Sequence, residues 1–186
     1  MDRSQASRRR LLDAGAAEFA AHGVAGARVD RISADARVSK AQIYSYYAGK
    51  EQLFDAVLED QVNDILDRAP LTADLPDYAV RLYDAYLEQP QLVRLATWAR
   101  LERSPVGPLF SATDETAKVE VIAEAQRTGR VRADIPATDI HAMVIGLALT
   151  WAQSSLTYTA TPEDPEADHR RRRASLAAAA RDAFMR

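Results

Sequence analysis

Residues 38–50 read VSKAQIYSYYAGK and place three tyrosines and two lysines within thirteen residues, although the whole chain has only seven tyrosines. Ser39 is a residue type whose hydroxyl commonly caps a helix N-terminus, and Gln42 three positions later completes the signature of a capping box. The pattern predicts a short helix over residues 39–47. A helix of this length is marginal in water on its own, so it must be held by packing.

A second short helix is predicted directly before this segment, over residues 29–37. Val29, Ile32 and Ala36 recur at helical spacing and form its apolar side. Two short helices joined by a tight turn are typical of a helix-turn-helix motif. In that motif the N-terminal residues of the second helix enter the major groove of DNA. The sequence therefore predicts a segment that reads DNA.

The rest of the chain also has the periodicity of helices. Leu11 and Phe19 belong to one apolar stripe, and Gly23 is a typical stop signal. Pro90 and Pro136 stand where helices begin, since a proline in the first turn loses no hydrogen bond. We expect an all-α fold of about nine helices without strands, with an N-terminal three-helix head and a C-terminal antiparallel helical body. The further helices are predicted over residues 7–21, 50–66, 77–89, 90–103, 110–128, 136–158 and 165–185.

The charge of the chain is unevenly distributed. Of its 186 residues, 47% are hydrophobic and 27% charged, and the net charge is −3. Residues 1–50 hold nine basic and five acidic residues, a net charge of +4, so the remainder carries −7. A basic N-terminal segment favours a polyanionic partner. Charge alone is explained equally well by chance clustering.

The sequence offers little for catalysis. It has no cysteine, and its three histidines, His22, His141 and His169, are far apart in the chain. None of the motifs HExxH, GxSxG or GxxxxGK[ST] occurs. We expect no enzyme, no cofactor and no metal. No stretch reaches the ~18 apolar residues that cross a bilayer, and the basic start leads into no apolar signal core. A cytoplasmic protein without a membrane partner is therefore expected.

Residues 9–58 read RRLLDAGAAEFAAHGVAGARVDRISADARVSKAQIYSYYAGKEQLFDAVL. With F-x-x-x-G at 19–23, V-x-x-I at 29–32 and the run at 36–53, this stretch resembles the TetR family of bacterial transcriptional repressors. The resemblance implies a helix-turn-helix DNA-binding domain and a ligand-binding and dimerisation domain, linked by the helix from residue 50. It implies a homodimer that binds a palindromic operator in duplex DNA and is released by a small, mostly apolar inducer. The implied domains are residues 1–48 and 49–186.

Two positions depart from the family pattern. Arg37 stands where the turn glycine is usual, and if this position needs a positive φ, arginine costs roughly 1 kcal/mol relative to glycine. Ala27 and Arg28 replace the threonine that usually precedes Val29. This removes a hydroxyl that caps the helix and contacts phosphate, and substitutes a cation.

The resemblance also implies which residues contact DNA. Lys50 begins a helix, where free N–H groups already favour an anion, and we expect it to bind phosphate. Gln42 either reads a base, as a glutamine can read adenine, or only closes the capping box on Ser39. The candidate DNA contacts are Arg28, Arg31, Ser39, Lys40, Ala41, Gln42, Tyr44, Ser45, Tyr46 and Lys50.

The three tyrosines of this segment are expected to differ in orientation. If Ile43 faces the core, Tyr44 is turned about 100° away, toward solvent or DNA. Tyr46 and Tyr47 follow Ile43 by three and four residues and share its face. We therefore expect Tyr47 to pack inward, Tyr44 to point outward, and Tyr46 to pack while still offering its hydroxyl to a phosphate.

The C-terminal part of the chain is expected to hold a ligand and a second copy. The resemblance implies a pocket for the inducer and a four-helix dimer interface made by the last two long helices of each subunit. In each case the alternative is plain core packing. The run Arg170–Arg173 is most simply a solvated face. The pocket candidates are Tyr83, Tyr86, Arg94, Trp98, Phe110, His141 and Trp151, and the interface candidates are Ile140, Val144, Leu147, Leu176, Ala180 and Phe184.

One non-enzymatic alternative remains from the sequence. A helical adaptor that binds other proteins without reading DNA would have the same helix count. It would have no reason for the basic N-terminal segment or for an exposed Tyr44, and a gel shift on DNA flanking the gene separates the two hypotheses.

Overall fold

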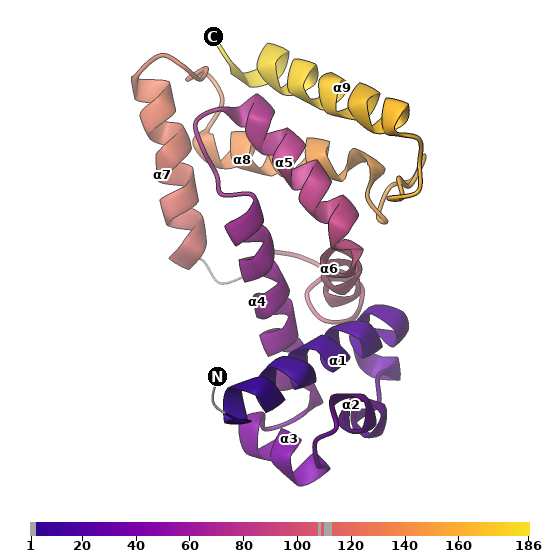
Figure 1. Cartoon of the computed structure of the whole chain (residues 1–186). Coiled ribbons are helices and arrows are strands. Elements are labelled where there is room, and N and C mark those ends of the chain that lie inside the picture. The colour runs from indigo at the N-terminus through magenta and orange to yellow at the C-terminus, as the bar shows by residue number, and fades with distance from the viewer. Residues whose placement is uncertain (1–2, 108, 110–112) are drawn as a thin grey trace. The chain divides into compact units, whose positions relative to one another are not determined.

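The computed structural model describes residues 3–107, 109 and 113–186, and within them the fold is all-α. The described residues form nine α-helices and one short 3₁₀ helix, with a single isolated bridge, between Val131 and Met185, in place of any sheet. The predicted fold class is confirmed. The helices, drawn in Figure 1, are α1 Arg3–Gly26, α2 Val29–Ala36, α3 Lys40–Tyr46, α4 Lys50–Arg68, α5 Leu75–Glu88, α6 Pro90–Glu102, α7 Thr113–Arg127, α8 Ala137–Ala148, η1 Leu149–Trp151 and α9 Glu166–Phe184.

The predicted helix over residues 136–158 is too long, because α8 ends at Ala148 and the 3₁₀ helix η1 that follows it ends at Trp151. Ala152 adopts extended backbone angles, with φ −76° and ψ 175°. The N–H of Ala160 then donates to the carbonyl of Trp151 at 2.8 Å, so the chain folds back on the end of the helix. Serine and threonine are frequent after Ala152, and their hydroxyls compete for backbone groups that a helix would use. The predicted start of the preceding helix, at 110, lies outside the described residues.

The chain forms two compact units. The first unit comprises Met1–Asp64 and Gln91–Leu109, and the second comprises Ile65–Pro90 and Phe110–Arg186. In the first unit, the rings of Phe19 and Phe54 meet edge to face with centroids 5.2 Å apart. The core of this unit is completed by fully buried aliphatic side chains, namely Leu11, Ile32, Ile43, Leu53 and Val57.

Helix α1 bends near its C-terminal end. Gly23 has φ 69° and ψ −178°, which lies outside the helical region. Glycine adopts this conformation more readily than other residues do. The carboxylate of Glu102, at the end of α6, accepts the N–H groups of Val24 and Ala25 at 2.8 and 2.9 Å. These two donors are freed by the bend, so the carboxylate caps the last turn of α1 as an N-cap residue would.

The second unit is built around α5. Helices α5, α8 and α9 pack against one another, and α7 packs on α8 (Figure 1). The ion pair between Arg173 of α9 and Asp84 of α5, at 2.8 Å, borders this packing. The apolar core of the unit comprises Leu75, Tyr78, Leu82, Ile122, Ile140, Val144, Leu176 and Phe184.

Arg37 ends α2 in the left-handed conformation. Its φ of 54° and ψ of 45° make it the one non-glycine residue with a positive φ in the described chain. Its N–H donates to the carbonyl of Ala34, and the N–H of Val38 donates to that of Ser33. These bonds close the C-terminus of α2 in the form that usually carries glycine. The departure noted in the sequence therefore falls on a position that does need positive φ.

We predict that Arg37→Gly raises the free energy of unfolding by about 0.5–1 kcal/mol, because glycine adopts this φ without a Cβ penalty but is more flexible when unfolded. Arg37→Ala is the matched control, since alanine loses the charge and keeps the Cβ. Urea denaturation followed by circular dichroism measures both. Equal stabilisation by the two variants would mean that charge, and not backbone strain, decides.

Candidate nucleic-acid interface

The side chain of Ser39 caps helix α3. Its hydroxyl oxygen accepts the backbone N–H of Gln42 at 3.1 Å, as the capping signature predicts. The side chain of Gln42 does not return to Ser39, and its Nε2 donates instead to the hydroxyl of Tyr46 at 3.5 Å. The hydroxyl of Tyr46 is also 3.1 Å from that of Ser4. The cap therefore needs the backbone of Gln42 and leaves its side chain on the flank of α3.

The exposures of Tyr44 on α3 and of Tyr47 directly after it agree with the predicted outward and inward orientations. Ile43 is 2% exposed and Tyr47 8%, while Tyr44 is 54% exposed. Tyr46 is half-buried. The hydroxyl of Tyr47 accepts a hydrogen bond from Nε of Arg8 at 3.3 Å. Helix α3 is thus held from behind by Ile43 and Tyr47, and Tyr44 projects from its outer face.

A buried carboxylate holds α2 against α1. Glu18 is 6% exposed, and its carboxylate accepts the N–H of Arg28 at 2.8 Å and Nε of Arg31 at 2.8 Å. The hydrogen bond from Arg31 is the main reason that the pKa of Glu18 lies below its usual value of 4.5. The guanidinium of Arg31, a predicted phosphate contact, is therefore already engaged within the chain.

Lys40 and Lys50, the two lysines of residues 38–50, also have partners within the first unit. Nζ of Lys50 donates to the carbonyls of Ala25 and Ala27 at 3.1 and 3.3 Å. Lys40 forms an ion pair with Asp30, and the hydrogen bond between them raises the pKa of Lys40. Each ammonium is thereby oriented, yet Lys40 keeps 57% of its side chain exposed.

The ten predicted contacts all lie in the first unit, on α2, α3, their flanking turns and the first residue of α4, and none of them is buried. The sequence prediction missed Glu18, the residue that positions two of them. The feature that could have revealed Glu18 is its spacing, since it lies three residues after Gly15 and seven after Leu11 and so falls on the apolar face of α1. A carboxylate at such a position is expected to have a buried partner.

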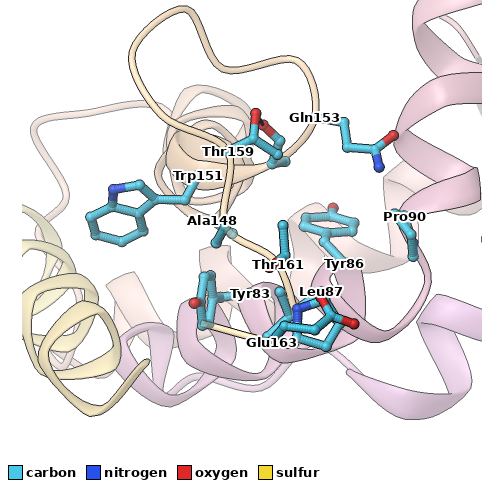
Figure 2. Close-up of a pocket in the computed structure, with 13 residues that line it drawn as sticks. Tyr83, Tyr86, Leu87, Pro90, Ala148, Trp151, Gln153, Thr159, Thr161 and Glu163 are labelled. Atoms are coloured by element: carbon cyan, nitrogen blue, oxygen red, sulfur yellow. Dashed lines mark hydrogen bonds between the residues drawn. The ribbon is translucent and has the colours of Figure 1, made fainter. Parts of the chain in front are cut away.

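The second unit contains a cavity of about 240 Å³ (Figure 2). Three of the seven predicted pocket residues line it, namely Tyr83, Tyr86 and Trp151. The rings of Tyr83 and Trp151 meet edge to face, with centroids 6.0 Å apart. The other side of the cavity belongs to the strap, which we define as residues 152–163 and which contributes Gln153, Thr159, Ala160, Thr161, Pro162 and Glu163 among others.

The remaining predicted pocket residues lie elsewhere. Arg94 and Trp98 belong to the first unit, where Nε of Arg94 and Nε1 of Trp98 donate to the carbonyl of Ala20 at 2.9 and 3.3 Å. Arg94 stands eight and Trp98 four residues before Glu102, so one face of α6 carries all three side chains that contact α1. His141 is buried on α8 and does not line the cavity. Phe110 lies outside the described residues.

A buried polar group supports the wall of the cavity. The hydroxyl of Tyr83 lies 2.7 Å from Nδ1 of His169. Arg172, one turn further along α9, pairs with Asp164 at 2.7 Å, and the two side chains are only 5% and 12% exposed. The hydrogen bond from Arg172 lowers the pKa of Asp164. Because Asp164 directly follows the strap, this pair ties the strap to α9.

The predicted interface residues lie inside the chain. Ile140, Val144, Leu176, Ala180 and Phe184 are at most 3% exposed and pack in the core of the second unit. Leu147 is half-buried against Tyr83 and Leu176. The prediction placed the apolar stripe of α8 and α9 toward a partner, whereas within one chain that stripe is already covered by α5. The exposed residues of the two helices are different ones, including Ala142, Met143, Gly146, Ala174 and Ala178.

Two sequence profiles match the chain. That of "Bacterial regulatory proteins, tetR family" matches residues 11–57, and that of "Tetracyclin repressor-like, C-terminal domain" matches residues 74–181. The chain belongs to the TetR family. Among the described residues, no helix of this TetR-family protein is long and apolar enough to span a membrane.

Relatives agree with this assignment. The HTH-type transcriptional repressor SCO4008 of Streptomyces coelicolor is 36% identical over 152 residues, which cover 80% of this chain and 79% of the relative. The HTH-type transcriptional repressor NicS of Pseudomonas putida is 30% identical over 77% of this chain and 75% of its own length. The crystal structure of the transcriptional regulator SCO4942 from Streptomyces coelicolor superposes with a TM-score of 0.79 at 35% identity, covering 96% of this chain and 98% of that one.

The family assignment decides between the classes of function considered from the sequence. TetR-family proteins are transcriptional regulators, and this chain is a DNA-binding transcriptional repressor of that family. The adaptor hypothesis, which had no role for DNA, is therefore disfavoured.

We predict that Glu18→Gln lowers the free energy of unfolding by about 1–3 kcal/mol at neutral pH, because Arg31 loses its charged partner. The pKa of Glu18 is depressed on folding, so its contribution is complete above 4.5 and is lost as the pH falls through the lower folded value. Urea denaturation at several pH values should show a smaller loss of stability on acidification for Glu18→Gln than for the unmodified protein. Asp13→Asn, an exposed change on the same helix, is the control, and identical pH profiles for all three proteins would contradict the role of Glu18.

Proposed function

We propose that this protein is a ligand-responsive repressor that binds a palindromic operator as a homodimer and releases it when a small molecule enters the cavity of the second unit. The observation that carries the DNA-binding part is the exposure of Tyr44 on a capped, internally pinned α3. A tyrosine that is 54% exposed on the outer face of a short helix has no packing role to explain it.

The proposed contacts divide into two kinds. Lys40, Tyr44 and Lys50 suit phosphate, because they place an ammonium or a hydroxyl on the exposed side of α3 and at the start of α4. Ala41 and Gln42 lie early in α3, where residues of a recognition helix meet base edges. The cap on α3 uses only the backbone N–H of Gln42, and its side chain makes a long hydrogen bond of 3.5 Å to the hydroxyl of Tyr46, which contact with a base would replace.

The exposed face of α8 supports the homodimer. Met143 is 40% exposed, and Ala142 and Gly146 are exposed beside it. A Cβ added at Gly146 would meet nothing within 4 Å, yet glycine inside a helix costs about 1 kcal/mol relative to alanine. Glycine is useful there if another backbone approaches closely. A second copy of α8 is such a partner, and a two-fold dimer matches two half-sites of a palindrome.

The cavity supports a ligand response. Its aromatic walls and few polar groups fit a mostly apolar small molecule. A ligand that binds better to a conformation unable to reach both half-sites must lower operator affinity to the same extent.

We predict that affinity for DNA flanking the gene falls steeply with salt and that Lys40→Gln reduces the slope of log affinity against log salt by about one. Fluorescence anisotropy over a salt series measures this. Arg181→Gln, an exposed basic change in the second unit, should leave the slope unchanged. An affinity that does not change with salt concentration, or an equal change of slope in both variants, would contradict the proposed interface.

We predict that the protein is a dimer at micromolar concentration and that Met143→Glu makes it monomeric, because the carboxylate would be buried unpaired at the interface. Sedimentation equilibrium gives the mass. Leu101→Glu, an equally polar change at an exposed position of α6, should stay dimeric. A monomeric unmodified protein would refute the proposed assembly.

A further inference from the structure

The cavity lining carries formal charge of one sign, which is negative. Among the described residues that line it, Glu163 carries the one formal charge, and no lysine, arginine or histidine belongs to the lining. The other polar groups are hydroxyls and an amide, from Tyr86, Gln153, Thr159 and Thr161. A cavity with this lining offers a carboxylate ligand no cation to pair with.

The nearest buried cation does not change this balance. Arg172 lies behind the wall formed by Tyr83, and its guanidinium pairs with Asp164 at 2.7 Å. Its other face is covered by the ring of Tyr158, at 5.1 Å from the ring centroid. A guanidinium neutralised and covered in this way is unavailable to an occupant of the cavity.

The aromatic side chains favour positive charge. Tyr83, Tyr86 and Trp151 line the cavity, and the face of an aromatic ring attracts a cation through its quadrupole. The hydroxyl of Tyr86 makes no hydrogen bond within the described chain, and burial raises the pKa of this group, so it stays protonated. Figure 2 shows the Tyr86 ring among the lining side chains, where the partial negative charge of its hydroxyl oxygen can face an ammonium.

We propose that the cavity takes a compact organic cation, in which an ammonium is attached to a small apolar or aromatic body and lies on the Glu163 side of the opening. This rests on the proposed ligand response and specifies its ligand. A cavity of about 240 Å³ is smaller than most drug-sized sites, so the body is no larger than a single ring with short substituents. Glu163 is exposed, so its attraction is screened by water and the preference for a cation is moderate.

Isothermal titration calorimetry on the full chain tests the proposal with three probes of similar size: benzyltrimethylammonium, benzyl alcohol and phenylacetate. The cation should bind about fivefold tighter than the alcohol, and phenylacetate should bind most weakly. Glu163→Gln should reduce the preference for the cation at least twofold and leave the affinity for benzyl alcohol unchanged. Asp182→Asn, which removes an exposed charge from the same unit outside the cavity, should change none of the three affinities.

Three results would overturn the proposal: equal affinities for the three probes, tightest binding of phenylacetate, or no binding of any probe. Operator binding is measured on the same samples, so failure of the charge preference is separable from failure of the proposed function. If DNA binds and the charge preference is absent, only the ligand class is wrong. If the cation binds as expected and the operator is not released, the ligand response is wrong and the cation site stands.

Discussion

The hydrogen bonds of one buried carboxylate hold α2 on α1 and so organise the helix-turn-helix region of the first unit. Glu18 accepts the first N–H of the α2 region, from Arg28, and the side chain of Arg31, and so fixes α2 on α1. Burying an unpaired carboxylate is costly, and these charge-assisted bonds offset that cost. Because α3 packs on α2, its position depends on the same contact. A helix too short to persist alone is thereby held in one place.

The cations of this region are also held by partners within the chain. Arg31, Lys40 and Lys50 each have a partner inside the first unit, namely a carboxylate, a carboxylate and a pair of backbone carbonyls. In the proposed DNA complex, such partners would orient a long side chain before a phosphate is bound, which reduces the conformational entropy lost on binding. They would also compete with the phosphate, most clearly in the pair of Lys40 with Asp30.

Local features such as a helix cap could be predicted from the sequence. What each helix packs against could not be predicted as well. The cap by Ser39 and the outward Tyr44 follow from residue type and spacing within one or two turns. A positive φ at Arg37 could be expected only because the family usually has glycine at that position. The sequence predicts helix for residues 152–158, the first part of the strap, because the segment 136–158 is apolar at its start, and hydroxyl competition after Ala152 outweighs that pattern. Periodicity could not show whether the apolar stripe of α8 and α9 faces the core of its own chain or a partner chain, since a core and an interface both select apolar residues. Arg94 and Trp98 were placed with the pocket because the sequence does not reveal that α6 belongs with α1.

The contacts between α6 and α1 have a consequence for how the family member can diverge. Arg94, Trp98 and Glu102 all end on backbone atoms, the carbonyl of residue 20 and the N–H groups of residues 24 and 25. Of those three positions of α1, residues 20 and 24 are buried, and only Ala25 is exposed. A Cβ at Gly23 would come within 2.5 Å of the Glu102 carboxylate, so a side chain at the bend would disturb the contact directly, whereas a change at residue 25 would leave it in place.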